Sequence, residues 1–252
     1  MCHDINSCPP IPTSENGTAR GEDLIITAAD GKRSAAFLAL PKQPIGVQVL
    51  IYPDVRGLHP FYTELALRFA EKGITALALD YFGRTAGLKP RDSFDHMPHL
   101  QQLQQATFFA DVTAALNALK VEDQAHQPTF IVGFCLGGAL SLYTATEPCF
   151  ELAGVIGFYA ALSLTMEKET FLEASKRIRF PVLGLFGGGD SFIPAEQLEV
   201  LDHNLKQGHR EHEIVVYPDA PHSFFDRSAE QWAEASCDAW QRVLDFIRAY
   251  TR

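Results

Sequence analysis

The chain has 252 residues, of which 46% are hydrophobic, and a formal net charge of −10 at pH 7. This length and composition suffice for one sizeable hydrophobic core. The negative charge argues against nucleic acid as a partner, because phosphate binding needs a basic face. No apolar run approaches the roughly 20 residues that span a bilayer, and residues 1–10 lack the basic and apolar regions of a signal peptide. We therefore expect a cytoplasmic protein with neither a membrane partner nor a nucleic-acid partner.

Five cysteines are spread along the chain at positions 2, 8, 135, 149 and 237, and no two of them form a C-x-x-C pair. This spacing suits neither a disulfide framework nor a zinc site. Cys2, His3 and Asp4 are adjacent, so their side chains point apart, and we expect no metal and no cofactor. Residues 1–20 are expected to form an N-terminal arm, and residues 21–252 a single domain.

The predicted elements alternate along the chain. Asp30-Gly31 lies between two apolar segments, 24–28 and 34–40, and predicts a β-hairpin. Predicted strands follow at 46–52, 74–79, 129–132, 153–159, 182–186 and 212–217, and predicted helices at 61–72, 97–119, 136–146, 167–176, 195–206 and 229–250. An opening hairpin followed by this alternation indicates an α/β protein with a mostly parallel sheet flanked by helices. Residues 85–97 look like an insertion, which is either a solvated connector or a loop over the ligand crevice.

The hexapeptide Gly133-Phe134-Cys135-Leu136-Gly137-Gly138 lies between a predicted buried strand and a predicted helix. Glycines two residues before and after the cysteine allow a turn too tight for a Cβ atom. Such a turn is the nucleophile elbow, here with cysteine in place of serine, and a helix N-terminus favours a thiolate. Free cysteine is also among the most buried residue types, so the hexapeptide alone leaves catalysis and core packing open.

Two further residues each follow a predicted strand. Asp190 comes after Gly187-Gly188-Gly189, with no lysine or serine of a phosphate-binding loop behind it. His222 is the only one of nine histidines in an apolar, proline-constrained segment after a strand. Alone, Asp190 reads as a turn former and His222 as a surface residue. The order cysteine, acid, histidine is that of α/β-hydrolases, so we expect all three at one edge of the sheet, with the imidazole as base and the carboxylate orienting it.

The chain resembles the dienelactone hydrolase family, the cysteine-dependent branch of the α/β-hydrolases, from the hairpin near residue 24 to the last helix. The motifs that carry the resemblance are the hexapeptide around Cys135, Gly188-Gly189-Asp190 with Ile193-Pro194, His222-Ser223-Phe224, Asp80-Tyr81-Phe82-Gly83-Arg84 and Asp54-Val55-Arg56-Gly57. The resemblance implies the α/β-hydrolase fold, with a mostly parallel central sheet, flanking helices and an N-terminal β-hairpin.

The resemblance implies catalytic roles for five positions. Cys135 is the nucleophile, His222 its base, and Asp190 the acid that orients the histidine. The backbone amides of Leu136 and Val55 form the oxyanion hole, where each donor is worth on the order of 3 kcal/mol.

The resemblance also implies substrate contacts and reveals two departures. Arg84 matches the arginine that holds the substrate carboxylate, and further candidates for substrate binding are Ser223, Arg56 and Arg227. Asp54 stands where the family has a glutamate that contacts the resting thiol, so its side chain is one methylene shorter. Asp226 stands where a second substrate-binding arginine is expected, and its charge would repel a substrate carboxylate.

Together these features predict a hydrolase that cleaves a carboxylic ester or lactone, dienelactone-like and anionic, through Cys135 and a thioester acyl-enzyme. The expected partner is this small molecule, and the expected state is a monomer or weak homodimer. Two other classes stay open. One is a non-catalytic or redox-sensing binding protein that uses the thiol, and the other is a thioesterase or peptidase with the same three residues.

Overall fold

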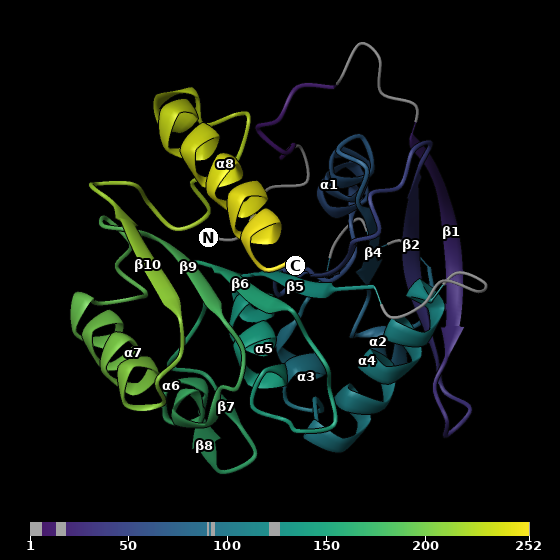
Figure 1. Ribbon diagram of the computed structural model, residues 1–252. Helices are drawn as coiled ribbons and strands as arrows, with labels where there is room; N and C mark the ends of the chain where they lie inside the picture. The colour runs from purple at the N-terminus through teal and green to yellow at the C-terminus, as the bar shows by residue number, and fades with distance from the viewer. Residues whose placement is uncertain (1–6, 14–18, 90, 92–93, 121–126, 252) are drawn as a thin grey trace.

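A computed structural model describes residues 7–13, 19–89, 91, 94–120 and 127–251. Eight strands form one sheet in the order β1-β2-β4-β3-β5-β6-β9-β10 (Figure 1). Their bounds are β1 Ala19–Thr27, β2 Arg33–Pro41, β3 Gln48–Tyr52, β4 Thr75–Leu79, β5 Thr129–Phe134, β6 Gly154–Phe158, β9 Val182–Gly187 and β10 His212–Tyr217. Strand β2 is antiparallel to β1 and β4, and every other neighbouring pair is parallel. The predicted hairpin and mostly parallel sheet are confirmed.

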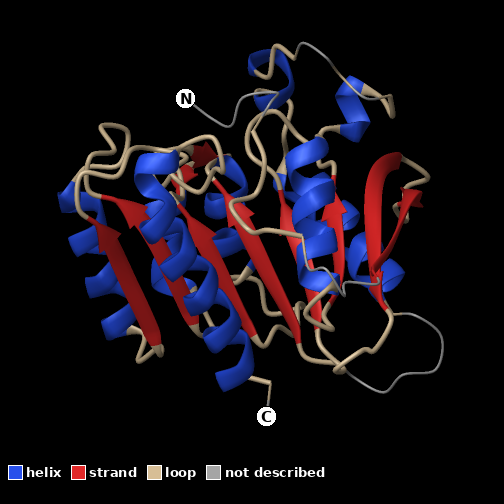
Figure 2. Cartoon of the chain, turned by 90° about the horizontal axis from the view of Figure 1, so that it is seen from above, coloured by secondary structure: helices blue, strands red, loops and turns tan. Residues whose placement is uncertain are grey.

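Helices cover both faces of this sheet. Helices α1 (Pro60–Ala70) and α8 (Ala233–Ala249) lie on one face, and α4 (Gln105–Leu119), α5 (Leu136–Thr144) and α7 (Ala195–Gln207) lie on the other (Figure 1). All residues of β3, β4, β6 and β9, and all of β5 except Thr129, are therefore buried, as expected for parallel strands between two helical layers. Figure 2 shows the strands side by side in one twisted layer.

The predicted helix over 97–119 is wrong, because the structure breaks it in two. Helix α3 (Met97–Leu100) ends in a turn, and Gln104 is extended, with φ −121° and ψ 141°, before α4 begins. The break lets both Leu100 and Leu103 pack against the core. Glutamine and leucine are good helix formers, so local propensity gave no sign of the break.

The predicted helix over 167–176 is also wrong at its start. Strands β7 (Thr165–Met166) and β8 (Glu169–Thr170) form a small hairpin with Glu167 in the left-handed region. Thr170 then caps α6 (Phe171–Ala174): its side chain accepts from the Glu173 amide, and the Glu173 carboxylate accepts from the Thr170 amide. This capping box sets the helix start at Phe171, four residues later than we expected. The remaining short helices are α2 (Gly83–Ala86), η1 (Ser175–Arg177) and η2 (Glu230–Trp232).

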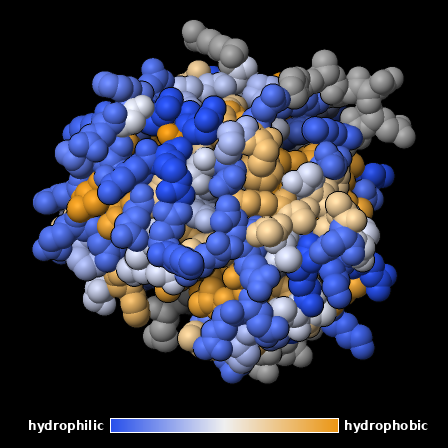
Figure 3. All heavy atoms as spheres, turned by 90° about the horizontal axis from the view of Figure 1, so that it is seen from below, coloured by the Kyte–Doolittle hydropathy of each residue, from blue (hydrophilic) through white to orange (hydrophobic). Residues whose placement is uncertain are grey.

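Parallel strands bring their carboxyl ends to one edge of the sheet. The residues that follow β3, β5, β9 and β10 are Asp54, Cys135, Asp190 and His222 with their loops, and the site is built there. Polar side chains cover most of the face drawn in Figure 3, and apolar atoms surface among them in patches. Among the described helices, none is long and apolar enough to cross a membrane.

Candidate active site

Cys135 lies at the sharp turn from β5 into α5. Its backbone is strained, with φ 54° and ψ −114°. A Cβ added to Gly133 would lie 2.0 Å from the Gly137 carbonyl oxygen, and one added to Gly137 would lie 2.1 Å from the Pro53 carbonyl oxygen. The glycines flanking the cysteine are therefore required by close backbone approach, as the sequence predicted.

Neighbouring backbone fixes Cys135 in this conformation. Its amide donates to the carbonyl of Phe158 at 3.0 Å, and its carbonyl accepts from the amide of Ala161 at 3.0 Å. The residue is 7% exposed and stands at the N-cap of α5. The thiol is thus held where the helix dipole stabilises a negative charge.

His222 and Asp190 are hydrogen-bonded. His222 Nδ1 lies 2.6 Å from Asp190 Oδ2, and Asp190 Oδ1 accepts the amide of Phe192 at 2.9 Å. Both side chains are buried, with 8% of the imidazole and none of the carboxylate exposed. A carboxylate at Nδ1 favours the tautomer with its proton there and leaves Nε2 as an acceptor.

Tyr159 links the cysteine turn to the histidine loop. It lies between Phe158 and Ala161, two of the residues whose backbones bind Cys135, and has φ 35°. Its ring centroid is 4.9 Å from that of His222. The structure thereby brings the predicted nucleophile and base, which are far apart in sequence, to the same edge of the sheet.

Asp54 is buried in the turn after β3. The β3–β5 register pairs Tyr52 with Gly133, so continuing it places Asp54 opposite Cys135. Asp54 Oδ1 accepts the amide of Arg56 at 2.8 Å, and the carbonyl of Asp54 accepts the Tyr81 hydroxyl at 2.6 Å. The turn is therefore fixed in place beside the elbow.

One predicted oxyanion donor directly follows Cys135, and the other lies on the Asp54 turn. Leu136 is the first residue of α5, so the helix itself supplies no acceptor for its amide. Val55 is half-buried on the Asp54 turn. Their positions are compatible with the predicted hole.

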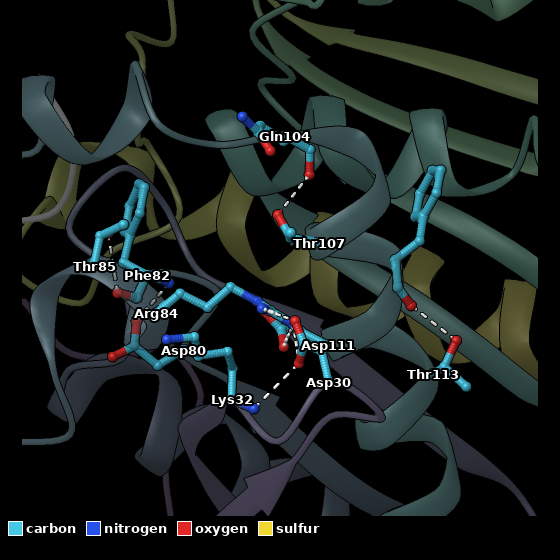
Figure 4. Close-up of polar contacts among 11 residues, drawn as sticks. Asp30, Lys32, Asp80, Phe82, Arg84, Thr85, Gln104, Thr107, Asp111 and Thr113 are labelled. Atoms are coloured by element: carbon cyan, nitrogen blue, oxygen red, sulfur yellow. Dashed lines mark hydrogen bonds and ion pairs between the residues drawn. The ribbon is translucent and has the colours of Figure 1, made fainter.

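Arg84 is surrounded by carboxylates (Figure 4). Its Nε and Nη2 donate to Asp111 at 2.7 and 2.8 Å, and its Nη1 and Nη2 donate to Asp30 at 2.5 and 3.2 Å. The hydrogen bond from Arg84 lowers the pKa of the exposed Asp30, whereas burial raises the pKa of Asp111. The guanidinium joins the β1–β2 turn to α4, and its predicted contact with a substrate carboxylate stays a prediction.

Arg227 is also engaged by the protein. Its guanidinium donates to Glu64 at 2.7 Å and to the Pro9 carbonyl at 3.2 Å, and its amide donates to the Cys8 carbonyl at 2.9 Å. Cys8 and Pro9 of the expected N-terminal arm thus lie against the segment that follows His222. Residues 1–6, with the Cys2-His3-Asp4 run, and residues 14–18 lie outside the described residues.

The aspartate expected to repel a substrate carboxylate holds this same segment. Asp226 is 8% exposed, and its Oδ1 accepts the amides of Ser228 at 2.9 Å and Cys8 at 3.4 Å. Ser223 has φ 61° beside His222, and Arg56 is half-buried on the Asp54 turn. Substrate binding by Ser223 and Arg56 stays a prediction.

Two polar features of this edge were missed by the sequence reasoning. The first is an ion pair between Asp80, which follows β4, and Arg91, whose guanidinium carbon lies 4.4 Å over the Phe94 ring. Burial raises the pKa of Asp80 to about 6, although Arg91 opposes the shift. Arg91 Nη1 would lie 3.1 Å from a Cβ on Gly57, so this part of the 85–97 segment lies against the turn after β3.

The second missed feature is His59, which directly precedes α1. Its Nε2 lies 3.8 Å from Asp54 Oδ2, and 9% of its side chain is exposed. The sequence signal was a histidine just before a helix-starting proline, Pro60, and it did not distinguish a buried ring from a surface one. Among the described residues, no group of three or more His, Cys, Asp or Glu side chains is placed to hold a metal ion.

A strained strand–turn–helix elbow at the carboxyl edge of a mostly parallel, helix-flanked sheet is the arrangement of the α/β-hydrolase fold. The family model described as the dienelactone hydrolase family matches residues 34–251. The chain therefore belongs to the dienelactone hydrolase family, and it is an enzyme of the ester- and lactone-hydrolase class.

Individual relatives agree over nearly the whole chain. A carboxymethylenebutenolidase of Rhodococcus opacus is 28% identical over 261 residues, covering 99% of this chain and 97% of that protein. A candidate carboxymethylenebutenolidase of Salmonella typhimurium is 32% identical over 235 residues, covering 88% of this chain and 85% of that protein. The crystal structure of a candidate dienelactone hydrolase from Klebsiella pneumoniae has a TM-score of 0.79 and 26% identity, covering 92% of this chain and 100% of that one.

Proposed function

We propose that this protein hydrolyses a small carboxylic ester or lactone with Cys135 as nucleophile, His222 as base and Asp190 as the acid that orients it. The observation that carries the proposal is the 2.6 Å hydrogen bond from the imidazole to Asp190, on the same sheet edge as a strained cysteine at the head of α5. A cysteine that only packs the core needs neither a strained backbone nor an oriented imidazole nearby.

The reaction runs in two halves. The Sγ proton of Cys135 moves to Nε2 of His222, and the thiolate attacks the carbonyl carbon. The amides of Leu136 and Val55 hold the oxyanion, the C–O bond to the leaving alcohol breaks, and His222 returns the proton to that alcohol. Water then gives a proton to His222 and attacks the thioester. The C–S bond breaks, the acid is released, and His222 returns the proton to Sγ of Cys135, which restores the thiol. In a lactone, the leaving alcohol stays attached to the acyl group.

Asp54 assists the first proton transfer. Its carboxylate is fixed on the turn opposite Cys135, and in its ionised form it accepts a hydrogen bond from the resting thiol, whose proton then moves to His222. Its side chain is shorter than the glutamate of the resemblance, but the tight packing of Gly137 against Pro53 brings the whole turn close to the elbow.

For an anionic substrate, the candidate contacts are Arg84, Arg56, Arg227 and Ser223. Arg84 can bind the carboxylate of the substrate only if that carboxylate replaces the one of Asp30 or of Asp111 at the guanidinium. Asp30 is the replaceable one, because its side chain is 46% exposed whereas that of Asp111 is 2% exposed. This exchange is the most direct way for the engaged guanidinium to take a carboxylate.

The test compares hydrolysis of p-nitrophenyl acetate and a simple lactone by wild type, Cys135→Ala and Cys135→Ser. We expect Cys135→Ala to lose at least about 10³-fold in kcat/KM, in line with removal of a nucleophile. Cys237→Ala is the matched control, because Cys237 is an exposed thiol on α8 and its loss should leave the rate unchanged. Undiminished hydrolysis by Cys135→Ala would refute the proposal.

We further propose that the enzyme works in the cytoplasm as a monomer or weak homodimer. The net charge of −10 and the length of 252 residues are compatible with either state. Light scattering across a concentration series decides between them, and a stable tetramer would contradict both.

A further inference from the structure

The buried histidine beside Asp54 carries an inference beyond the three catalytic residues. His59 is extended, with φ −145° and ψ 173°, and stands at the N-cap of α1, yet its side chain does not cap the helix. Its ring lies against the edge of Tyr62 instead, with ring centroids 4.7 Å apart. This orientation points the imidazole back toward the turn that carries Asp54.

The buried ring nitrogens of His59 require hydrogen-bond partners. Within the described part of the chain, neither Nδ1 nor Nε2 of His59 makes a hydrogen bond, although both atoms are buried. A buried polar group left in that state costs about 1–3 kcal/mol. Asp54 Oδ2, at 3.8 Å from Nε2, lies within ion-pair range, and a shift of about 1 Å would turn the contact into a charge-assisted hydrogen bond.

Burial also acts on the carboxyl group of Asp54. It is completely buried, and burial disfavours the charged form of a carboxyl group. A protonated imidazole at this distance favours the ionised carboxylate, since opposite charges within 4–6 Å stabilise one another. The pair therefore supplies Asp54 with the charge that its assistance to Cys135 requires.

We propose that His59 is a positioning residue that keeps Asp54 ionised and aimed at the thiol of Cys135. The proposal deepens the function proposed above and rests on it for the role of Asp54. His59 itself touches neither substrate nor thiol in this account. Its effect is transmitted through one carboxylate.

Other charged and titratable groups surround the pair and contribute to its pH response. The Asp54 amide donates to the Tyr62 hydroxyl at 2.9 Å, and the Asp80–Arg91 pair lies against Gly57 of the same turn. The groups that face His59 and Asp54 from the turn, from α1 and from the segments after β4 are Arg56, Tyr62, Tyr81, Asp80 and Arg91. These groups stay constant across the variants below, so differences between variants report on His59.

The first experiment compares the histidine ring signals by NMR in wild type and in Asp54→Asn. Loss of the carboxylate should shift the ring resonances of His59, because its Nε2 loses the charged partner at 3.8 Å. His212 is the internal control, because its Nε2 pairs with Asp202 at 3.1 Å at the start of β10, on the opposite edge of the sheet. Unchanged His59 ring resonances in Asp54→Asn would overturn the inference, whether or not the protein hydrolyses esters.

The second experiment measures the pH profile of kcat/KM in His59→Gln, Asp54→Asn, the double variant and His212→Gln. Without His59 the buried Asp54 takes up a proton more readily, so the acid limb should move about one unit higher, with the rate recovering at high pH. The double variant should be no slower than Asp54→Asn, and His212→Gln should match wild type. A uniform loss at every pH in His59→Gln, or additive losses in the double variant, would overturn the inference.

Discussion

Replacement of Gly137 by alanine should disturb both the stability and the activity of this enzyme. The new Cβ would lie 2.1 Å from the Pro53 carbonyl oxygen and 2.3 Å from that of Tyr52, about 1.3 Å short of the 3.4 Å at which ordinary contact begins. Both neighbours are backbone atoms of β3 and its turn, so no side chain can move aside. Overpacking of this kind costs about 1–3 kcal/mol, and 3 kcal/mol lowers Tm by roughly 6–12 °C in a chain of this size.

The same displacement separates the Asp54 turn from Cys135. A misplacement near 1 Å costs on the order of 100-fold in rate, so kcat/KM for p-nitrophenyl acetate should fall by about that factor at temperatures where the variant is folded. Thermal unfolding by circular dichroism and steady-state kinetics measure the two effects. Gly157→Ala is the control, because its Cβ would meet nothing closer than Ala160 Cβ at 3.5 Å. If Gly137→Ala matched Gly157→Ala in both Tm and rate, the close-approach reasoning would be refuted.

Three further substitutions test other parts of the site. Asp190→Asn should lower kcat/KM about 10³- to 10⁴-fold by removing the carboxylate that orients His222, and a loss below tenfold would contradict that role. Asp80 has a pKa raised to about 6 by burial, so the native state holds its proton more tightly than the unfolded chain and its contribution to stability declines as pH rises from about 4 to 6. Between pH 4 and 6, denaturant unfolding should therefore show the free energy of unfolding of Asp80→Asn rising by about 3 kcal/mol relative to that of wild type. A difference between the two free energies that stayed constant with pH would contradict the raised pKa of Asp80. Asp30→Asn should release one side of Arg84 and lower KM for an anionic ester relative to a neutral one, and an unchanged ratio would show that Arg84 does not bind the substrate carboxylate.

The sequence predicted the fold class and the elbow because both are encoded locally. Buried β-branched runs marked the strands, and glycines on either side of Cys135 marked a turn whose reason is the contact of Gly137 with Pro53. The chain order of Cys135, Asp190 and His222 then placed all three at one sheet edge. The local sequence pattern did not indicate the break before α4, because Gln104 leaves the helical conformation without any helix-breaking residue.

The engagement of Arg84 could not be predicted from its motif. Its partners Asp111 and Asp30 lie 27 and 54 residues away in sequence, and only the folded sheet brings the β1–β2 turn and α4 to the same guanidinium. His59 was missed for a related reason. Its burial depends on the packing of α1 against the turn after β3, which the residues around it do not specify.

The proposed thioester is tested most directly by trapping it. Wild-type enzyme mixed with p-nitrophenyl acetate, quenched in acid within the first turnovers and mapped by mass spectrometry should carry one acetyl group on the Cys135 peptide. That group should be removed by neutral hydroxylamine and be absent from Cys135→Ala. Turnover with no acetyl group on Cys135, or with a stable acetyl group on another residue, would contradict the account.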